Sequence, residues 1–201
     1  MATSASEGRV LIFLDVDGVL LPFGARAGSS TTLTDGALFP DAPLAALSVL
    51  VEAVPQAEIV LSSTWRVQDS YIRMIEDDWR RYAAAQIRTA RVDDTPLTTS
   101  TTRLATLEIV DRTDPALHSQ RSAEIYDWIR RHTANNSNSP IAAWLAVDDE
   151  DLYAEEDDSG VPRHVWDGHF INTQSNVGLT RADAATGVAL LWAQLEEGRQ
   201  P

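Results

Sequence analysis

An α/β fold with a mainly parallel central sheet is predicted by three features of the sequence. Short, continuous apolar runs are typical of strands buried on both faces, and they occur at residues 9–14, 57–61 and 141–147. Helix-like stretches separate these runs, with apolar residues three or four apart. Each of the three runs is followed directly by oxygen-bearing side chains. Alternating strands and helices favour a parallel sheet that is covered by helices.

The first half of the chain is predicted to hold three strands and two helices. A strand at 9–14 is followed by a helix at 44–53, which Pro43 precedes, as prolines often do at helix starts. The remaining predicted elements are a strand at 57–61, a charged helix at 67–88, a loop at 93–102 and a strand at 104–110.

The second half repeats the alternation. A helix is predicted at 119–132, a loop at 135–140 and a buried strand at 141–147. A short strand is expected at 170–173. Thr180 is expected to cap a final helix over 181–197, because Asp183 stands three residues further on.

Length and composition predict one domain. Residues 1–8 are expected to be a disordered tail, and 9–201 a single domain in which a small helical insertion is allowed within 67–120. The 201 residues include no cysteine, which excludes thiol chemistry and suits a reducing, cytoplasmic location. No apolar run is long enough for a membrane span.

The net charge limits the possible binding partners, and the kinds of basic residue limit the cationic side chains that a site can use. The net charge is −14, which argues against a broad nucleic-acid surface. All 16 basic residues are arginine, so any site that needs a protein cation must use arginine.

Carboxylates at the strand ends predict a metal site. Asp15 and Asp17 follow the first strand, and Asp148 and Asp149 follow the strand at 141–147. In parallel sheets, ligands bind beyond the carboxyl ends of the strands. If these strands are neighbours, the carboxylates repel one another unless a cation lies between them, and oxygen ligands suit Mg²⁺.

These segments together resemble the haloacid dehalogenase (HAD) superfamily. The motif DVDGVL resembles its first motif, the serines of SSTWR its second, and AVDDED its fourth. The details SSTWR, WLAVDDE and NVGLT are similar to HAD domains related to multidomain RNA-repair (Swiss Army Knife) proteins. The resemblance implies a Rossmann-like, three-layer sandwich. About 45 residues separate the first two motifs, too few for a large cap.

The resemblance also implies residue roles in a Mg²⁺-dependent phosphohydrolase. Asp15 is the implied nucleophile, which forms an aspartyl-phosphate, and Asp17 the implied general acid and base. Ser63 is expected to bind a phosphoryl oxygen, with Ser62 as the alternative. The other implied contacts are Gly18 and Thr64 at the substrate, and Mg²⁺ held by Asp15, the Asp17 backbone carbonyl, Asp148 and Asp149.

The third motif departs from the commoner family pattern, because the chain has no lysine to neutralise the phosphate. Arg121, at the start of the helix before the strand at 141–147, is the best candidate by position. Arg112 and Arg103 are poorer candidates. Arginine is planar and forked, so it does not simply replace lysine.

Several alternatives stay open. The substrate is expected to be a small phosphoester or a phosphorylated nucleic-acid end. The chain is alternatively a non-catalytic binding module, which the arginine in place of lysine suggests, or a phosphotransferase; dehalogenation is disfavoured because Asp17 is the phosphatase-type acid. Trp65 either lines the site or packs, with packing preferred. The sequence does not determine the oligomeric state.

Overall fold

The computed structural model describes residues 8–24, 37–92, 108–116, 120–135, 139–154 and 160–198. These residues form a five-stranded sheet in the order β3-β2-β1-β4-β5, with every neighbouring pair parallel. The strands are β1 (Arg9–Leu14), β2 (Ala57–Leu61), β3 (Ile109–Arg112), β4 (Ile141–Asp148) and β5 (Phe170–Asn172).

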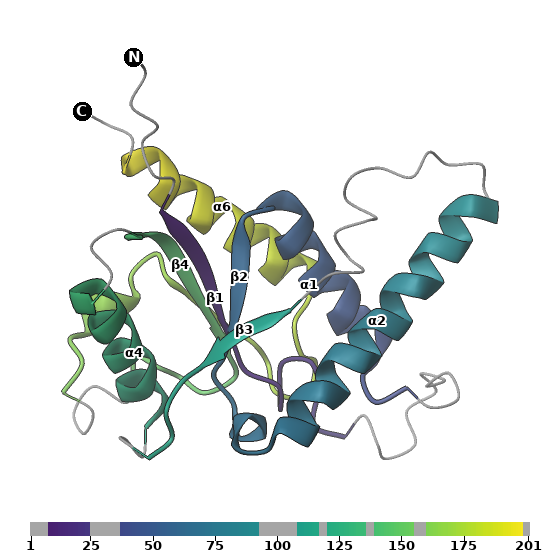
Figure 1. Cartoon of the computed structure of the whole chain (residues 1–201), viewed down its shortest axis with the longest axis horizontal. Helices are drawn as coiled ribbons and strands as arrows, with labels where there is room; N and C mark the ends of the chain where they lie inside the picture. Colours follow the sequence, from purple (N-terminus) through teal and green to yellow (C-terminus); the bar gives the residue numbers. More distant parts are fainter. Residues whose placement is uncertain are drawn as a thin grey trace.

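Helices cover both faces of the sheet (Figure 1). One face carries α1 (Asp41–Ala53), α2 (Asp69–Val92) and α6 (Arg181–Glu197), and the other carries α4 (Arg121–Asn135). Two short 3-10 helices, η1 (Thr64–Val67) and η2 (Arg163–Trp166), follow β2 and precede β5. The predicted α/β three-layer, Rossmann-like fold is therefore confirmed, and the described residues form no large cap.

The continuous apolar sequence of β1 is explained by its central position. Val10, Ile12 and Leu14 face the helices α1, α2 and α6, whereas Leu11 and Phe13 face α4. All five side chains are buried, so neither face of the strand tolerates a polar residue. Burying each side chain of this size stabilises the fold by roughly 1.5–3 kcal/mol.

Apart from β3, the strand boundaries agree with the sequence predictions to within one residue, and α6 has the predicted bounds, whereas the ends of α1, α2 and α4 differ by up to four residues. The strands β1 and β2 have the predicted bounds, and β4 is one residue longer than predicted. The predicted cap of the last helix is confirmed: the Asp183 N–H donates to Thr180 Oγ1 at 3.2 Å, and the Thr180 N–H donates to Asp183 Oδ2 at 3.0 Å.

The strand predicted at 104–110 overlaps the observed β3 but ends two residues too early, and residues 104–107 lie outside the described residues. β3 spans Ile109–Arg112 and therefore includes two charged residues. It is an edge strand, and its charges have partners outside the sheet: Trp128 Nε1 donates to Asp111 Oδ2 at 3.1 Å, and Arg112 pairs with Asp69. Apolar pattern alone does not find such a strand.

Two predictions about domain organisation stay untested. Residues 1–7 and the loop at 93–102 lie outside the described residues, so the disordered tail stays a prediction. The small insertion within 67–120 also stays a prediction, although α2 is a long helix in that interval.

Candidate active site

Every strand of the sheet ends in a buried side chain that carries oxygen. The five residues lie at the carboxyl ends of the strands, in spatial order Thr113, Ser62, Asp15, Asp148 and Thr173. Backbone bonds hold them in the sheet: the N–H groups of Ser62 and Asp15 donate to Leu14 O and Val147 O, at 2.9 and 3.0 Å. The oxygen atoms therefore form a continuous polar edge.

The topology places Asp15 and Asp148 at the point where the strand order reverses. From β1 the chain moves outward through β2 to β3, and then returns to β4 on the other side of β1. The helix after β1, α1, and the helix before β4, α4, lie on opposite faces of the sheet. This arrangement leaves a crevice between the ends of β1 and β4, which is the usual ligand site in such folds. Asp15 and Asp148 lie on the two strands that flank it.

The loop after β1 folds back as a single tight turn. The carbonyl of Val16 accepts hydrogen bonds from the N–H groups of Leu20 and Leu21, each at 2.9 Å. Gly18 has a φ of 72°, and a Cβ at this position would collide with the carboxylate of Asp149. Thr173 Oγ1 donates to the carbonyl of Gly18 at 3.0 Å and fixes the turn from β5. Gly18 is thus required both for the turn and for the approach of Asp149.

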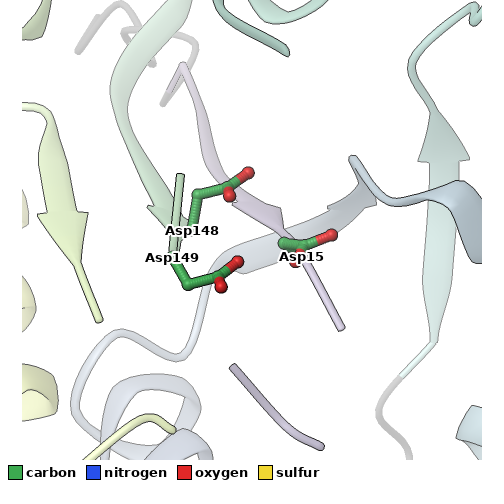
Figure 2. A group of neighbouring side chains, drawn as sticks. All are labelled: Asp15, Asp148 and Asp149. Atoms are coloured by element: carbon green, nitrogen blue, oxygen red, sulfur yellow. The ribbon is translucent and has the colours of Figure 1, made fainter. Parts of the chain in front are cut away.

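Three carboxylates meet in the crevice (Figure 2). Asp15, Asp148 and Asp149 each offer an oxygen atom, and these atoms lie within 4.8 Å of one another. Burial raises the pKa of Asp15 from 3.8 to about 6, against the opposing effects of Arg121 and of a hydrogen bond with Ser63. Burial and the charge of Asp15 raise the pKa of Asp148 well above its usual value. The three carboxylates keep too little positive charge around them to offset burial, and their hard oxygen atoms fit a cation such as Mg²⁺.

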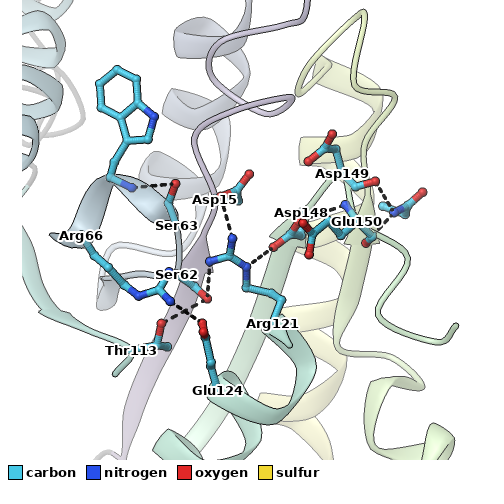
Figure 3. Close-up of polar contacts among 12 residues, drawn as sticks. Asp15, Ser62, Ser63, Arg66, Thr113, Arg121, Glu124, Asp148, Asp149 and Glu150 are labelled. Carbon is cyan, nitrogen blue, oxygen red and sulfur yellow. Dashed lines mark hydrogen bonds and ion pairs between the residues drawn. The ribbon is translucent and has the colours of Figure 1, made fainter. Parts of the chain in front are cut away.

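Arg121, the first residue of α4, is the cation at this cluster (Figure 3). Its Nη2 lies 3.4 Å from Asp15 Oδ1, its Nε lies 3.2 Å from Asp148 Oδ2, and its Nη1 donates to Ser62 Oγ at 3.5 Å. Burial acts to lower its pKa, but the neighbouring carboxylates outweigh this and raise it. Arg121 therefore stays charged and spans the crevice from β2 to β4.

The three hydroxyl-bearing residues after β2 have different surroundings. Ser62 Oγ accepts from Arg121 and from Thr113 Oγ1, the latter at 3.5 Å. Ser63 is also fully buried, and its hydrogen bond with Asp15 places its hydroxyl beside that carboxylate. Thr64 is exposed.

Some predicted residues do not join this cluster. The carboxylate of Asp17 is not in the group of three; it lies instead against Trp65, whose Nε1 donates to Asp17 Oδ2 at 2.9 Å. Arg112 is half exposed and pairs with Asp69 at 2.9 Å. Arg103 lies outside the described residues.

A buried ion pair next to Arg121 was missed by sequence reasoning. Arg66 Nη2 donates to Glu124 Oε2 at 2.6 Å, and both side chains are less than a tenth exposed. Glu124 lies one turn along α4 from Arg121 and also attracts it. Because Arg66 and Glu124 are 58 positions apart in the sequence, no local sequence pattern predicts their ion pair. Thr113 was missed for a different reason, since the strand before it was predicted to end two residues too early.

No helix among the described residues is long and apolar enough to cross a membrane.

The sheet order and the acidic crevice are those of a Rossmann-like α/β domain with a candidate metal site. The family described as "HAD domain in Swiss Army Knife RNA repair proteins" matches residues 11–184, and the chain belongs to this family. The resemblance inferred from the motifs is therefore confirmed. No curated protein and no solved structure matches the chain.

Proposed function

We propose that this chain is a Mg²⁺-dependent phosphohydrolase that cleaves a phosphomonoester through an aspartyl-phosphate on Asp15. The observation that carries the proposal is the meeting of Asp15, Asp148 and Asp149 in one crevice, with Arg121 across it. Family membership supports the broader assignment to hydrolases of the phosphatase type.

The proposed metal ligands are Asp15, Asp148 and Asp149, together with the backbone carbonyl of Asp17. The fit rests on the donor set: three carboxylate oxygen atoms lie within 4.8 Å, and two of the three residues are buried. Burial without enough positive charge raises the pKa values of Asp15 and Asp148, and a bound dication would relieve both. When bound, Mg²⁺ neutralises charge on the phosphoryl oxygens.

The proposed first step transfers the phosphoryl group to the protein. An oxygen of Asp15 forms a bond to phosphorus as the bond from phosphorus to the leaving oxygen breaks. The leaving oxygen keeps the electron pair and takes a proton from Asp17. Arg121 and Ser63 are proposed to bind the phosphoryl oxygens, because both already contact Asp15. Gly18, Ser62 and Thr64 are proposed to line the substrate site.

The proposed second step returns Asp15 to its free form. Asp17, now a carboxylate, takes a proton from water as the water oxygen bonds to phosphorus. The bond between phosphorus and Asp15 breaks, and inorganic phosphate leaves. The net reaction consumes one phosphomonoester and one water, and releases one alcohol and one phosphate.

The proposed substrates are a phosphorylated nucleic-acid end or a small phosphoester. The description of the family, which names RNA repair, supports a nucleic-acid end. The net charge of −14 favours recognition of the terminal phosphate alone over binding along a polyanion. The absence of cysteine supports a cytoplasmic location as part of the same proposal.

The test is hydrolysis of 4-nitrophenyl phosphate with Mg²⁺ or with EDTA, comparing the unaltered chain with Asp15→Asn. The matched control is Asp77→Asn, which alters an exposed aspartate on α2. Turnover that needs both Mg²⁺ and Asp15, and survives in the control, is the expected result. Equal turnover in Asp15→Asn contradicts the proposal. Absence of turnover, combined with no Mg²⁺ binding in calorimetry, favours a non-catalytic binding module.

A further inference from the structure

The carboxylate of Asp17 is held by a tryptophan rather than by the acidic cluster. The indole Nε1 of Trp65 donates to Asp17 Oδ2 at 2.9 Å, across 48 residues of chain. Within the described residues, the other oxygen, Oδ1, has no hydrogen-bond partner. Trp65 lies in the short helix η1, directly after the serines of β2, so the contact joins two strand ends at the crevice.

Aromatic neighbours fix the orientation of Trp65. Its ring centroid lies 5.8 Å from that of Phe39 and 5.5 Å from that of Tyr71. Phe39 is fully buried and is itself tied to α2, because its N–H donates to Asp78 Oδ2 at 2.8 Å. An indole has a single donor, and a half-buried indole usually orients this donor toward one partner. Here that partner is Asp17.

We propose that Trp65 is a positioning residue for Asp17. By holding Oδ2, Trp65 keeps Oδ1 free to contact the oxygen that leaves phosphorus. This inference rests on the proposed function, in which Asp17 protonates the leaving oxygen. A general acid must lie about 2.6–3.2 Å from the atom that it protonates. A misplacement of about 1 Å lowers the rate by roughly 100-fold.

The role of Trp65 has a signature that depends on the leaving group. An alkoxide is strongly basic, so it leaves slowly unless it is protonated. The 4-nitrophenolate ion is weakly basic and leaves without a proton. Losing the indole N–H should therefore slow the first step much more for an alkyl phosphate than for 4-nitrophenyl phosphate. A merely structural defect slows both reactions alike.

The test compares Trp65→Phe with the unaltered chain on ethyl phosphate and 4-nitrophenyl phosphate. Phenylalanine keeps an aromatic ring against Phe39 and Tyr71 but removes the donor. The quantity compared is kcat/KM, because it reports only the steps up to departure of the leaving group, whereas Asp17 acts as the base of the second step for both esters. We expect kcat/KM on ethyl phosphate to fall roughly 10- to 100-fold and kcat/KM on the aryl ester to fall less than about threefold. Asp17→Asn gives the reference for full loss of the acid. Tyr71→Leu is the matched control; it alters the same aromatic group without touching the hydrogen bond, and should change both rates equally.

The outcomes separate this inference from the proposed function. Equal losses of kcat/KM on both esters in Trp65→Phe, or no loss on either, overturn the positioning role alone. Absence of Asp15-dependent turnover of both esters in the unaltered chain overturns the proposed function and this inference with it.

A second measurement does not depend on the folding of Trp65→Phe. Among the six indole N–H resonances in the NMR spectrum, that of Trp65 should shift in Asp17→Asn. An unchanged resonance would contradict the contact.

Discussion

Replacing Asp15 with asparagine is expected to stabilise the metal-free protein at neutral pH, although it removes the proposed nucleophile. Asp15 is only 4% exposed, and burial is the main reason that its pKa is raised from 3.8 to about 6. The attraction of Arg121 already contributes to this value and does not cancel the effect of burial. An asparagine has nearly the same shape and stays neutral at every pH.

Asp15→Asn is expected to be the more stable protein at neutral pH because the folded and unfolded chains bind a proton at Asp15 with different affinity. Between about pH 4 and pH 6, the folded protein binds a proton at Asp15 more tightly than the unfolded chain does. The contribution of Asp15 to stability is therefore greatest below pH 4 and is lost as the pH rises through 6. A pKa difference of about two pH units, at about 1.4 kcal/mol each, amounts to about 3 kcal/mol.

The assay is urea unfolding in EDTA at pH 4, 6 and 8, followed by tryptophan fluorescence. Asp15→Asn should exceed the unaltered chain in free energy of unfolding by up to about 3 kcal/mol at pH 8, with the difference shrinking toward pH 4. The exposed control Asp77→Asn should change stability little at any pH. A less stable Asp15→Asn at pH 8 would refute the reasoning, because Arg121 would then stabilise the charged carboxylate more than burial destabilises it.

Two further predictions concern the surroundings of the cluster. Glu124→Gln should lower the free energy of unfolding by roughly 3–5 kcal/mol in urea unfolding, because it leaves a buried guanidinium without its anion; Asp77→Asn, at an exposed ion pair, should cost less than about 1 kcal/mol. Gly18→Ala should weaken Mg²⁺ binding at least about tenfold in calorimetry, because its Cβ displaces Asp149. Gly24 also has a positive φ, 90° against 72° for Gly18, but has open space around it. Equal Mg²⁺ affinities of Gly24→Ala and Gly18→Ala would therefore contradict the steric argument.

The interior of the fold was predictable because central parallel strands are apolar on both faces. β1 and β2 were predicted with their observed bounds for this reason. The edge strand β3 was not, since an edge can place Asp111 and Arg112 next to partners on helices. The error in β3 also hid Thr113 at its end.

Site residues that lie at the end of a strand or the start of a helix could be predicted from the sequence. Contacts between residues far apart in the sequence could not. The sequence indicated Asp15, Asp148 and Asp149 together, and the position of Arg121 at a helix start indicated its place beside them. The contact of Trp65 with Asp17 joins residues 48 positions apart and leaves no periodic signal in the sequence. Only the packing of η1 against the first loop reveals it.

The most direct test of the central claim is to trap the phosphoryl group on the protein. Asp17→Asn should slow release of the intermediate, and 4-nitrophenyl phosphate avoids the need for an acid in the first step. After mixing with Mg²⁺ and an acid quench, peptide mass spectrometry should find phosphate on the peptide that contains Asp15, and none in the variant that also carries Asp15→Asn. Phosphate on another residue, or Mg²⁺-dependent turnover in the Asp15→Asn variant, would contradict the assignment of Asp15 as the nucleophile.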